Sequence, residues 1–234
     1  MDTPMLRTCL LALITAVPWS FTFATRYHVL PSANGSSTGL TWENAFTNLQ
    51  EALGVVIPGD EIWVAAGQYR PTTGTSRTIS FELRNGVDLF GGFSGTETAL
   101  DQRDHLVNTT VLNGDIGEPG NSLDNSHSVV RANQLTSTTV LDGFRIVNGY
   151  SSSGSGYNGG GLRVTNVLSG KLIIRNCSFL NNYSGTYGGC IYMAAAKLDL
   201  VKCTFNNNQA GSGSGGAICN GNNNGGYSQL NMLD

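Results

Sequence analysis

The chain has 234 residues, a formal net charge of −3 and only 12% charged residues, so it is long enough for one domain with its own hydrophobic core. No run of basic residues is present to neutralise phosphates, which argues against a nucleic-acid partner. The 31 glycines would suit a disordered chain, but 40% of the residues are hydrophobic and occur in short regular runs. This composition favours a fold of many short strands and tight turns.

Residues 1–24 have the features of an export signal. Arg7 supplies a positive charge, residues 9–17 form an apolar run that Pro18 ends, and Thr22-Phe23-Ala24 offers small residues at the usual cleavage positions. The apolar run is too short to cross a bilayer of about 30 Å as a helix. We therefore expect cleavage near Ala24, no transmembrane segment, and a secreted or cell-surface location. The alternative is a buried N-terminal strand or helix.

An amphipathic helix is predicted within residues 41–53, with Thr41 as its N-cap. Its apolar residues recur at helical spacing, at Trp42, Phe46, Leu49 and Leu53. A short helix of this kind would cover the open end of a stack of strands, where an uncovered edge invites aggregation.

Short strands are predicted after this helix. Residues 58–60 form a turn signal before a strand at 61–64, and two further apolar runs, 81–83 and 87–89, flank the strong turn signal Asn85-Gly86. These elements assign residues 25–136 to an N-terminal cap and the first coils of a solenoid.

The densest polar segment of the chain is residues 113–127. Oxygen-bearing side chains of this kind are the ligands that calcium prefers, although the spacing does not match an EF-hand. The candidate calcium ligands are Asp115, Glu118, Asn121, Asp124 and Asn125. The competing interpretation is a long polar loop without a metal, so calcium is the one cofactor that the sequence suggests.

Residues 137–234 contain an internal repeat, which is the strongest signal in the sequence. The segments 172–182 and 198–208 superpose on each other, and Gly-Gly motifs recur between them. The residues that carry the repeat are Phe144, Phe179, Phe205, Asn182, Asn208, Gly159, Gly160, Gly188, Gly189, Gly215, Gly216, Cys177 and Cys203. The last copy is interrupted at Asp234, so we expect the repeat to continue in a longer protein.

The repeat predicts an all-β fold, a right-handed parallel β-helix with a short N-terminal helix and strand cap. Apolar residues alternate with period two at 172–174 and 198–200, which is typical of short strands with one buried face. A repeat of about 26 residues divided among strands and Gly or Asn turns fits one coil. Asn is expected at the turns because it tolerates a left-handed backbone, and the Gly-Gly pairs are expected at tight corners.

Four cysteines remain after removal of the signal: Cys177, Cys190, Cys203 and Cys219. An exported protein can form disulfides, but the repeat places Cys177 over Cys203 as small apolar side chains in neighbouring coils. Stacked thiols are therefore favoured over a bridge, and no Cys/His cluster with zinc-ligand spacing is present.

The motifs Gly-Gly-Ala-Ile at 215–218 and Phe-x-x-Asn at 179–182 and 205–208 resemble the repeats of chlamydial polymorphic membrane proteins. The segments PGDEIWVAAGQYRP, LRNGVDLFGGFSGTET and TVLDGFRIVNG are similar to parts of large secreted bacterial proteins of the pectin-lyase-like β-helix superfamily. The resemblance implies a surface adhesin associated with the outer membrane. Gly161 and Cys190 depart from the pattern, because Ala is expected there.

Two functions follow from the resemblance, since that superfamily holds adhesins as well as polysaccharide lyases and hydrolases. We favour a scaffold that binds glycans or proteins of another cell. A tyrosine platform is its candidate ligand surface, formed by Tyr150, Tyr157, Tyr183 and Tyr187. The alternative is a lyase or hydrolase of acidic polysaccharide. The catalytic carboxylates expected of it are not matched, and its candidate bases are Arg145, Arg163 and Arg175.

Overall fold

The structure is a computed structural model that describes residues 24–152, 157–221 and 227–234. The predicted signal, apart from Ala24, lies outside these residues. Within them, no helix is both long and apolar enough to span a bilayer.

The described chain is built mostly from short strands. Its helical elements are α1 (Leu49–Val55), η1 (Leu100–Gln102) and η2 (Ser122–Asp124). The strands of the first part are β1 (Arg26–Val29), β2 (Glu61–Ala65), β3 (Gly67–Tyr69), β4 (Phe81–Glu82), β5 (Asp88–Phe93), β6 (Thr110–Asn113), β7 (Val130–Asn133), β8 (Thr138–Asp142), β9 (Phe144–Val147) and β10 (Tyr150–Ser151). The strands of the second part are β11 (Leu162–Arg175), β12 (Ser178–Leu180), β13 (Tyr183–Ser184), β14 (Ile191–Val201), β15 (Thr204–Asn206), β16 (Gln209–Ala210), β17 (Ile218–Gly221) and β18 (Gln229–Leu233).

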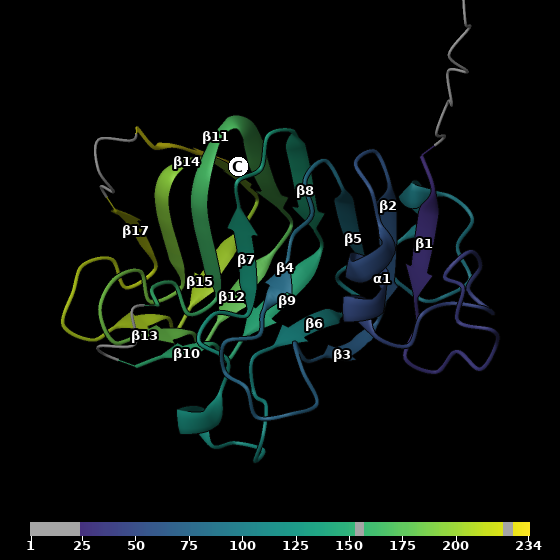
Figure 1. The fold of residues 1–234 in the computed structure, drawn as a ribbon, viewed down its shortest axis with the longest axis horizontal. Coiled ribbons are helices and arrows are strands. Elements are labelled where there is room, and N and C mark those ends of the chain that lie inside the picture. Colours follow the sequence, from purple (N-terminus) through teal and green to yellow (C-terminus); the bar gives the residue numbers. More distant parts are fainter. Residues whose placement is uncertain (1–23, 153–156, 222–226) are drawn as a thin grey trace, which may run out of the picture.

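The strands form several parallel sheets. One sheet has the order β1-β2-β5-β8-β11-β14-β17, a second the order β3-β6-β9-β12-β15 and a third the order β10-β13-β16. Strands β4, β7 and β18 are also joined to the first sheet. In the repeat region, consecutive strands such as β8, β9 and β10 lie in different sheets, and they pair with β11, β12 and β13 of the next passage. Figure 1 shows these passages side by side, with the colours running across the molecule in sequence order. The arrangement is compatible with a parallel β-helix.

The offset that relates the two copies of the repeat is also the register between β12 and β15. Phe179 pairs with Phe205, and their rings stack with centroids 5.2 Å apart and planes 4° apart. The prediction for Phe144 was wrong, because Ile146 is the residue that pairs with Phe179. Phe144 lies two residues earlier, where its backbone N–H points at the Cys177 sulfur. The reason is that the register is continuous through the corner, with Asp142 opposite Arg175 and Val147 opposite Leu180, so Phe144 falls in the column of Cys177 and not in that of Phe179.

The asparagines of the repeat do not act as the sequence predicts. The left-handed backbone occurs at Asn181 and Asn207, with φ of 55° and 52°, and not at the motif positions Asn182 and Asn208. The Asn182 side chain is fully buried and bonds the main chain of the neighbouring coil, including the carbonyl of Ile146. Polar side chains inside a core must find such partners, so the buried Asn182 and the partly buried Asn208 form an amide ladder.

The glycine motifs lie at corners, as predicted. Gly159, Gly188 and Gly215 have φ of 76°, 60° and 77°. A Cβ on Gly188 would overlap the carbonyl oxygen of Ile191, so both the backbone conformation and the space require glycine.

The N-terminal helix is shorter than predicted. Helix α1 begins after Asn48, whose side chain accepts a hydrogen bond from the Gln50 N–H, so Asn48 and not Thr41 is the N-cap. Phe46 instead forms a parallel bridge with Val29 of β1. This tertiary pairing holds the segment before Asn48 extended, which propensity and spacing alone do not show.

One hydrophobic core runs between the sheets and includes the buried face of α1. All four described cysteines are free thiols. The Cys177 and Cys203 thiols each donate to a carbonyl of an adjacent coil, that of Leu141 at 3.6 Å and that of Ile174 at 3.5 Å. Burial raises the pKa of both thiols, so they behave as small apolar side chains.

Candidate functional site

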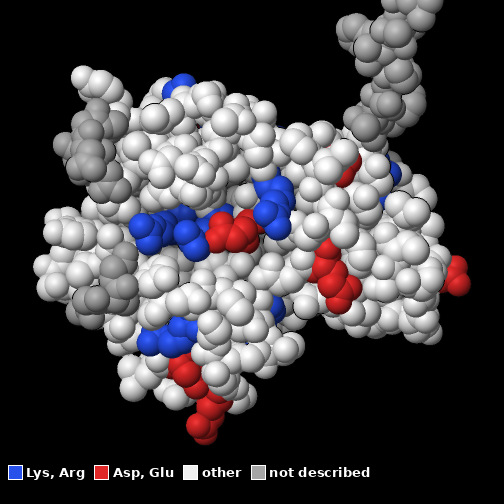
Figure 2. Space-filling model, in the orientation of Figure 1, with Lys and Arg blue, Asp and Glu red and all other residues white. Residues whose placement is uncertain are grey.

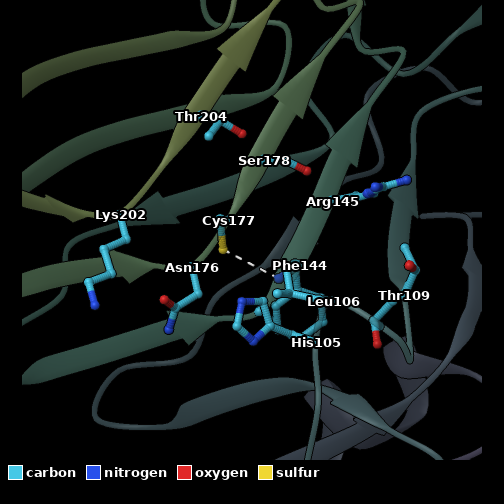
Figure 3. Close-up of a pocket in the computed structure, with 12 residues that line it drawn as sticks. His105, Leu106, Thr109, Phe144, Arg145, Asn176, Cys177, Ser178, Lys202 and Thr204 are labelled. Atoms are coloured by element: carbon cyan, nitrogen blue, oxygen red, sulfur yellow. Dashed lines mark hydrogen bonds between the residues drawn. The ribbon is translucent and has the colours of Figure 1, made fainter. Parts of the chain in front are cut away.

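A groove of about 490 Å³ lies on the outer face of the sheet that contains β9, β12 and β15 (Figure 3). Its floor comes from the starts of these strands, and one wall comes from the segment before β6. The labelled lining residues in Figure 3 are His105, Leu106, Thr109, Phe144, Arg145, Asn176, Cys177, Ser178, Lys202 and Thr204.

The strand register places three polar side chains of the groove in one row. Arg145 of β9 pairs with Ser178 of β12, and Ser178 pairs with Thr204 of β15. Side chains alternate between the two faces of a strand, so the buried residues Ile146 and Phe179 point inward while this row faces outward.

A second row comes from the tight turns between β8 and β9, β11 and β12, and β14 and β15. Gly143, Asn176 and Lys202 hold the same left-handed conformation there, with φ of 83°, 51° and 50°. One residue with positive φ turns the chain sharply between two strands. The Asn176 and Lys202 side chains therefore stand at the edge of the groove, beside the row of Arg145.

A buried carboxylate, that of Asp142, holds one of the residues that line the groove, Asn176. The Asp142 side chain is 2% exposed, and its Oδ2 accepts from Arg103 Nη2 and Arg175 Nε, each at 2.6 Å. Its Oδ1 accepts from Asn176 Nδ2 at 2.9 Å. Burial alone would raise the pKa of Asp142, but the hydrogen bonds from Arg103, Asn176 and Arg175 hold it below the ordinary value. Asp142 is thus ionised and already neutralised by its own partners.

The groove itself is cationic. Arg145 and Lys202 line it, whereas none of its lining residues among the described parts of the chain is Asp or Glu. A second hollow of about 480 Å³ shares His105 and Asn176 with it and extends towards Arg103 and Asp101. Next to the groove, two arginines share the single Asp142 carboxylate, so this cluster carries a net positive charge.

Four donor side chains of the groove are unused by the protein, whereas the Asn176 amide is engaged by Asp142. Across the described residues, the side chains of Arg145, Ser178, Lys202 and Thr204 make no hydrogen bond and no ion pair. Unpaired donors on one concave surface are what recognition of a carboxylate or sulfate requires.

The candidate tyrosines form two separate stacks. Tyr150 and Tyr183 pair in register with ring centroids 4.7 Å apart, and the Arg77 guanidinium carbon lies 5.9 Å from the Tyr150 ring centre. Tyr157 stacks instead on His127, at 4.6 Å. The next coil has Gln209 opposite Tyr183, which ends the first stack.

Tyr187 belongs to neither stack and is 49% exposed. Each ring of the Tyr150–Tyr183 pair uses one face on its partner, so a sugar could meet only the outer faces, the edges and the hydroxyls. A ligand-binding role for the four tyrosines stays a prediction.

The candidate calcium ligands divide into two sets. Asp115 and Asn125 line a hollow of about 240 Å³ that Tyr150 also lines. The Asp124 carboxylate accepts from the Glu118 backbone N–H and from Asn121 Nδ2, so the Asp124 and Asn121 side chains are engaged within their own loop. Within the described residues, no group of three or more His, Cys, Asp and Glu side chains gathers in a way that could hold a metal.

The three arginines that the sequence offers as catalytic bases lie in different places. Arg145 faces the groove, and Arg175 is held by Asp142. Arg163 lies on another face, in register with Arg131, which forms an ion pair of 3.0 Å with Glu82. Figure 2 shows the charged side chains of that face gathered in a short band across strands β4, β7 and β11, with few charges around them.

Sequence reasoning missed Arg103, His105, Asn176 and Lys202. Asn176 and Lys202 could have been found, because each directly precedes a cysteine of the repeat and so occupies an equivalent position. Arg103 and His105 lie in an excursion between β5 and β6 that has no counterpart in the repeat. Comparison with protein-family models, with curated proteins and with solved structures finds no match to this chain.

Proposed function

We propose that this protein is an exported β-helical scaffold at the cell surface that binds acidic glycans in the groove lined by Arg145, Asn176 and Lys202. The observation that supports the proposal is the set of unpaired donors on one concave surface that has no carboxylate among its described lining residues. A ligand carboxylate would gain charge-assisted hydrogen bonds there without displacing a partner inside the protein.

The scaffold is proposed to be a right-handed β-helix with α1 over its first coil. Parallel strands joined by crossover connections are right-handed in nearly all proteins, because the strand twist favours that hand. The buried face of α1, with Leu49, Ala52 and Leu53, packs beside β1 and β4 at the start of the stack. Export and an adhesin-like role rest on the sequence motifs.

Binding without turnover is favoured over a lyase or a hydrolase. A hydrolase needs two carboxylates across the scissile bond, and a calcium-dependent lyase needs carboxylates to hold the metal near its base. The lining of the groove offers neither among the described residues, and the carboxylate of Asp142, which bonds the lining residue Asn176, already accepts from three donors.

Calorimetric titration with oligogalacturonate at low salt tests the binding. Arg145→Gln and Lys202→Gln are each expected to raise the Kd about tenfold, since each removes one charge-assisted contact. Lys197→Gln is the matched control, because Lys197 lies on β14 but does not line the groove. A neutral dextran of equal length should not bind. Equal affinity in all three variants would refute the assignment of the groove.

The same samples decide between binding and lyase activity. Incubation of the protein with polygalacturonate, with and without calcium, is expected to leave the absorbance of unsaturated products unchanged. A steady rise that Arg145→Gln abolishes would replace the binding role with catalysis.

A further inference from the structure

The hollow of about 240 Å³ beside Tyr150 lies apart from the groove and differs from it in chemistry. It is formed by the polar segment after β6, by the turn between β9 and β10, and by the turn after β12. Its lining includes Asp115, Ser122, Asn125, Asn148 and Asn181. Among the described residues, Asp115 is the single charged one in that lining, so this hollow is acidic where the groove is basic.

The hydrogen bonds of the amides leave mainly oxygen atoms for a ligand. Asn125 Nδ2 donates to the Asn148 carbonyl at 2.8 Å, and Asn148 Nδ2 donates to Asn113 Oδ1 at 3.0 Å. Both amide nitrogens are therefore engaged with the protein. The Asp115 carboxylate accepts from the Gly120 N–H, at 3.1 and 3.2 Å, and keeps further lone pairs.

Asn125 supplies an independent sign that something is bound here. Its side chain is 5% exposed, and its Oδ1 has no hydrogen-bond partner within the described part of the protein. Oδ1 of the preceding residue, Asp124, is also buried without a partner there. Asp124 does not line the hollow, so the sign rests on Asn125. A buried oxygen without a donor is costly, and Asn125 Oδ1 therefore calls for a positive or hydrogen-bonding partner.

We propose that this hollow is a calcium site in which Asp115 and Asn125 are protein ligands and Ser122 and Asn148 contribute oxygens directly or through water. Hard oxygen donors of mixed carboxylate and amide type suit calcium, which accepts flexible geometry. The site does not depend on the function of the groove. It would tie the polar segment to the turns of two successive coils.

Affinity at this site is expected to be weak. A single carboxylate lines the described hollow, and Arg77 lies behind it, where its guanidinium donates to the carbonyls of Asn125 and Tyr150. Low ligand charge places calcium sites in the range of about 10⁻⁴–10⁻³ M.

Thermal unfolding of the full chain with calcium chloride tests the site. At about ten times the Kd, calcium is expected to raise the Tm by roughly 3–6 °C over a sample in chelator. Asp115→Asn should abolish this shift while keeping an acceptor for the Gly120 N–H. Glu118→Gln is the control, because Glu118 lies in the same segment but does not line the hollow.

A second variant, Asn125→Asp, is expected to strengthen calcium binding instead of abolishing it. Asn125→Asp removes the bond to the Asn148 carbonyl and should lower the Tm in chelator, but its added carboxylate should tighten calcium binding and enlarge the calcium-dependent shift at least twofold. The proposal is overturned by a Tm of the unmodified protein that ignores calcium, by an equal shift in Asp115→Asn, or by a shift with a neutral sugar in place of calcium.

Discussion

Single side chains stabilise this protein through contacts between coils rather than within one coil. The Asn182 amide is the best example, because its Oδ1 accepts from the Gly149 N–H at 2.9 Å and its Nδ2 donates to the Ile146 carbonyl at 3.0 Å. Its third partner is Asn208 Oδ1 in the following coil. One buried amide therefore joins three successive coils.

Replacement of Asn182 by Ala is expected to lower the free energy of unfolding by about 3 kcal/mol, since it leaves a buried N–H and a buried carbonyl without partners. Urea denaturation followed by circular dichroism measures the change. The matched control is Asn206→Ala, an exposed position on β15 whose loss should cost less than about 0.5 kcal/mol. Equal effects of the two substitutions would contradict the ladder.

The second prediction at this scale concerns Asp142, whose pKa is held below its ordinary value. Asp142→Asn is expected to cost about 2–3 kcal/mol at pH 7, less than a fully buried pair would, because the Arg175 side chain is 41% exposed.

The lowered pKa of Asp142 predicts how the effect of Asp142→Asn on stability changes with pH. A lowered folded pKa means that the carboxylate stabilises the protein above its unfolded pKa of about 3.9, and that the contribution is lost as the pH falls through the lower folded value. The difference in unfolding free energy between the unmodified protein and Asp142→Asn should thus be constant from about pH 5 to 7 and shrink below about pH 4. A difference that grows towards acid would rule out this role.

Elements are terminated here by backbone geometry more than by hydrogen-bonding caps. The corners before β11, β14 and β17 each use a glycine with positive φ, whereas Gly54 inside α1 has no atom within 4 Å of the place where a Cβ would lie. The corner glycines and Gly54 therefore differ in whether they tolerate a side chain.

A pair of substitutions tests this contrast. Gly188→Ala is expected to destabilise the protein by at least about 2 kcal/mol, since Ala is strained at φ of 60° and its Cβ meets the Ile191 carbonyl. Gly54→Ala should instead stabilise it by about 0.5–1 kcal/mol through helix propensity. Denaturant midpoints of the two variants should move in opposite directions, and a shift in the same direction would contradict the assigned geometry.

The whole molecule is a stack in which each coil depends on its neighbours. A single coil buries too few apolar side chains to offset a loss of conformational entropy of roughly 1–2 kcal/mol per residue, so the parallel ladders must supply the difference. The stacked pair Phe179 and Phe205 lies along this axis, with Phe179 fully buried and Phe205 partly exposed.

Phe179→Ala is expected to cost about 3–5 kcal/mol, as for a large aromatic side chain removed from a core. Phe205→Ala should cost less than half of that, because its ring is already partly in solvent. Thermal unfolding of the two variants gives the comparison. A larger loss for Phe205 than for Phe179 would mean that the coil of β15 is packed more tightly than the structure places it.

Much of the fold could be read from the sequence because the repeat is a local property. The period of the repeat sets the register of β12 with β15, and the Gly-Gly motifs mark the corners, since similar coils place similar residues in one column. The exceptions were Phe144, the turn asparagines and the N-cap of α1. Phe144 was assigned to the wrong column because the register through the corner places it opposite Cys177. At the N-cap, the pairing of Phe46 with Val29 overrides local spacing.

The sequence by itself determined that parallel strands stack with equivalent residues in columns, because periodicity and turn residues act within one coil. Only the tertiary structure decided the candidate site. Arg103 and His105 reach the groove from an excursion outside the repeat, and Arg103, Arg175 and Asn176 meet Asp142 across separations of 33 to 39 residues. These contacts depend on how far each loop folds back over the sheet. The spacing of residues along the chain does not predict that distance.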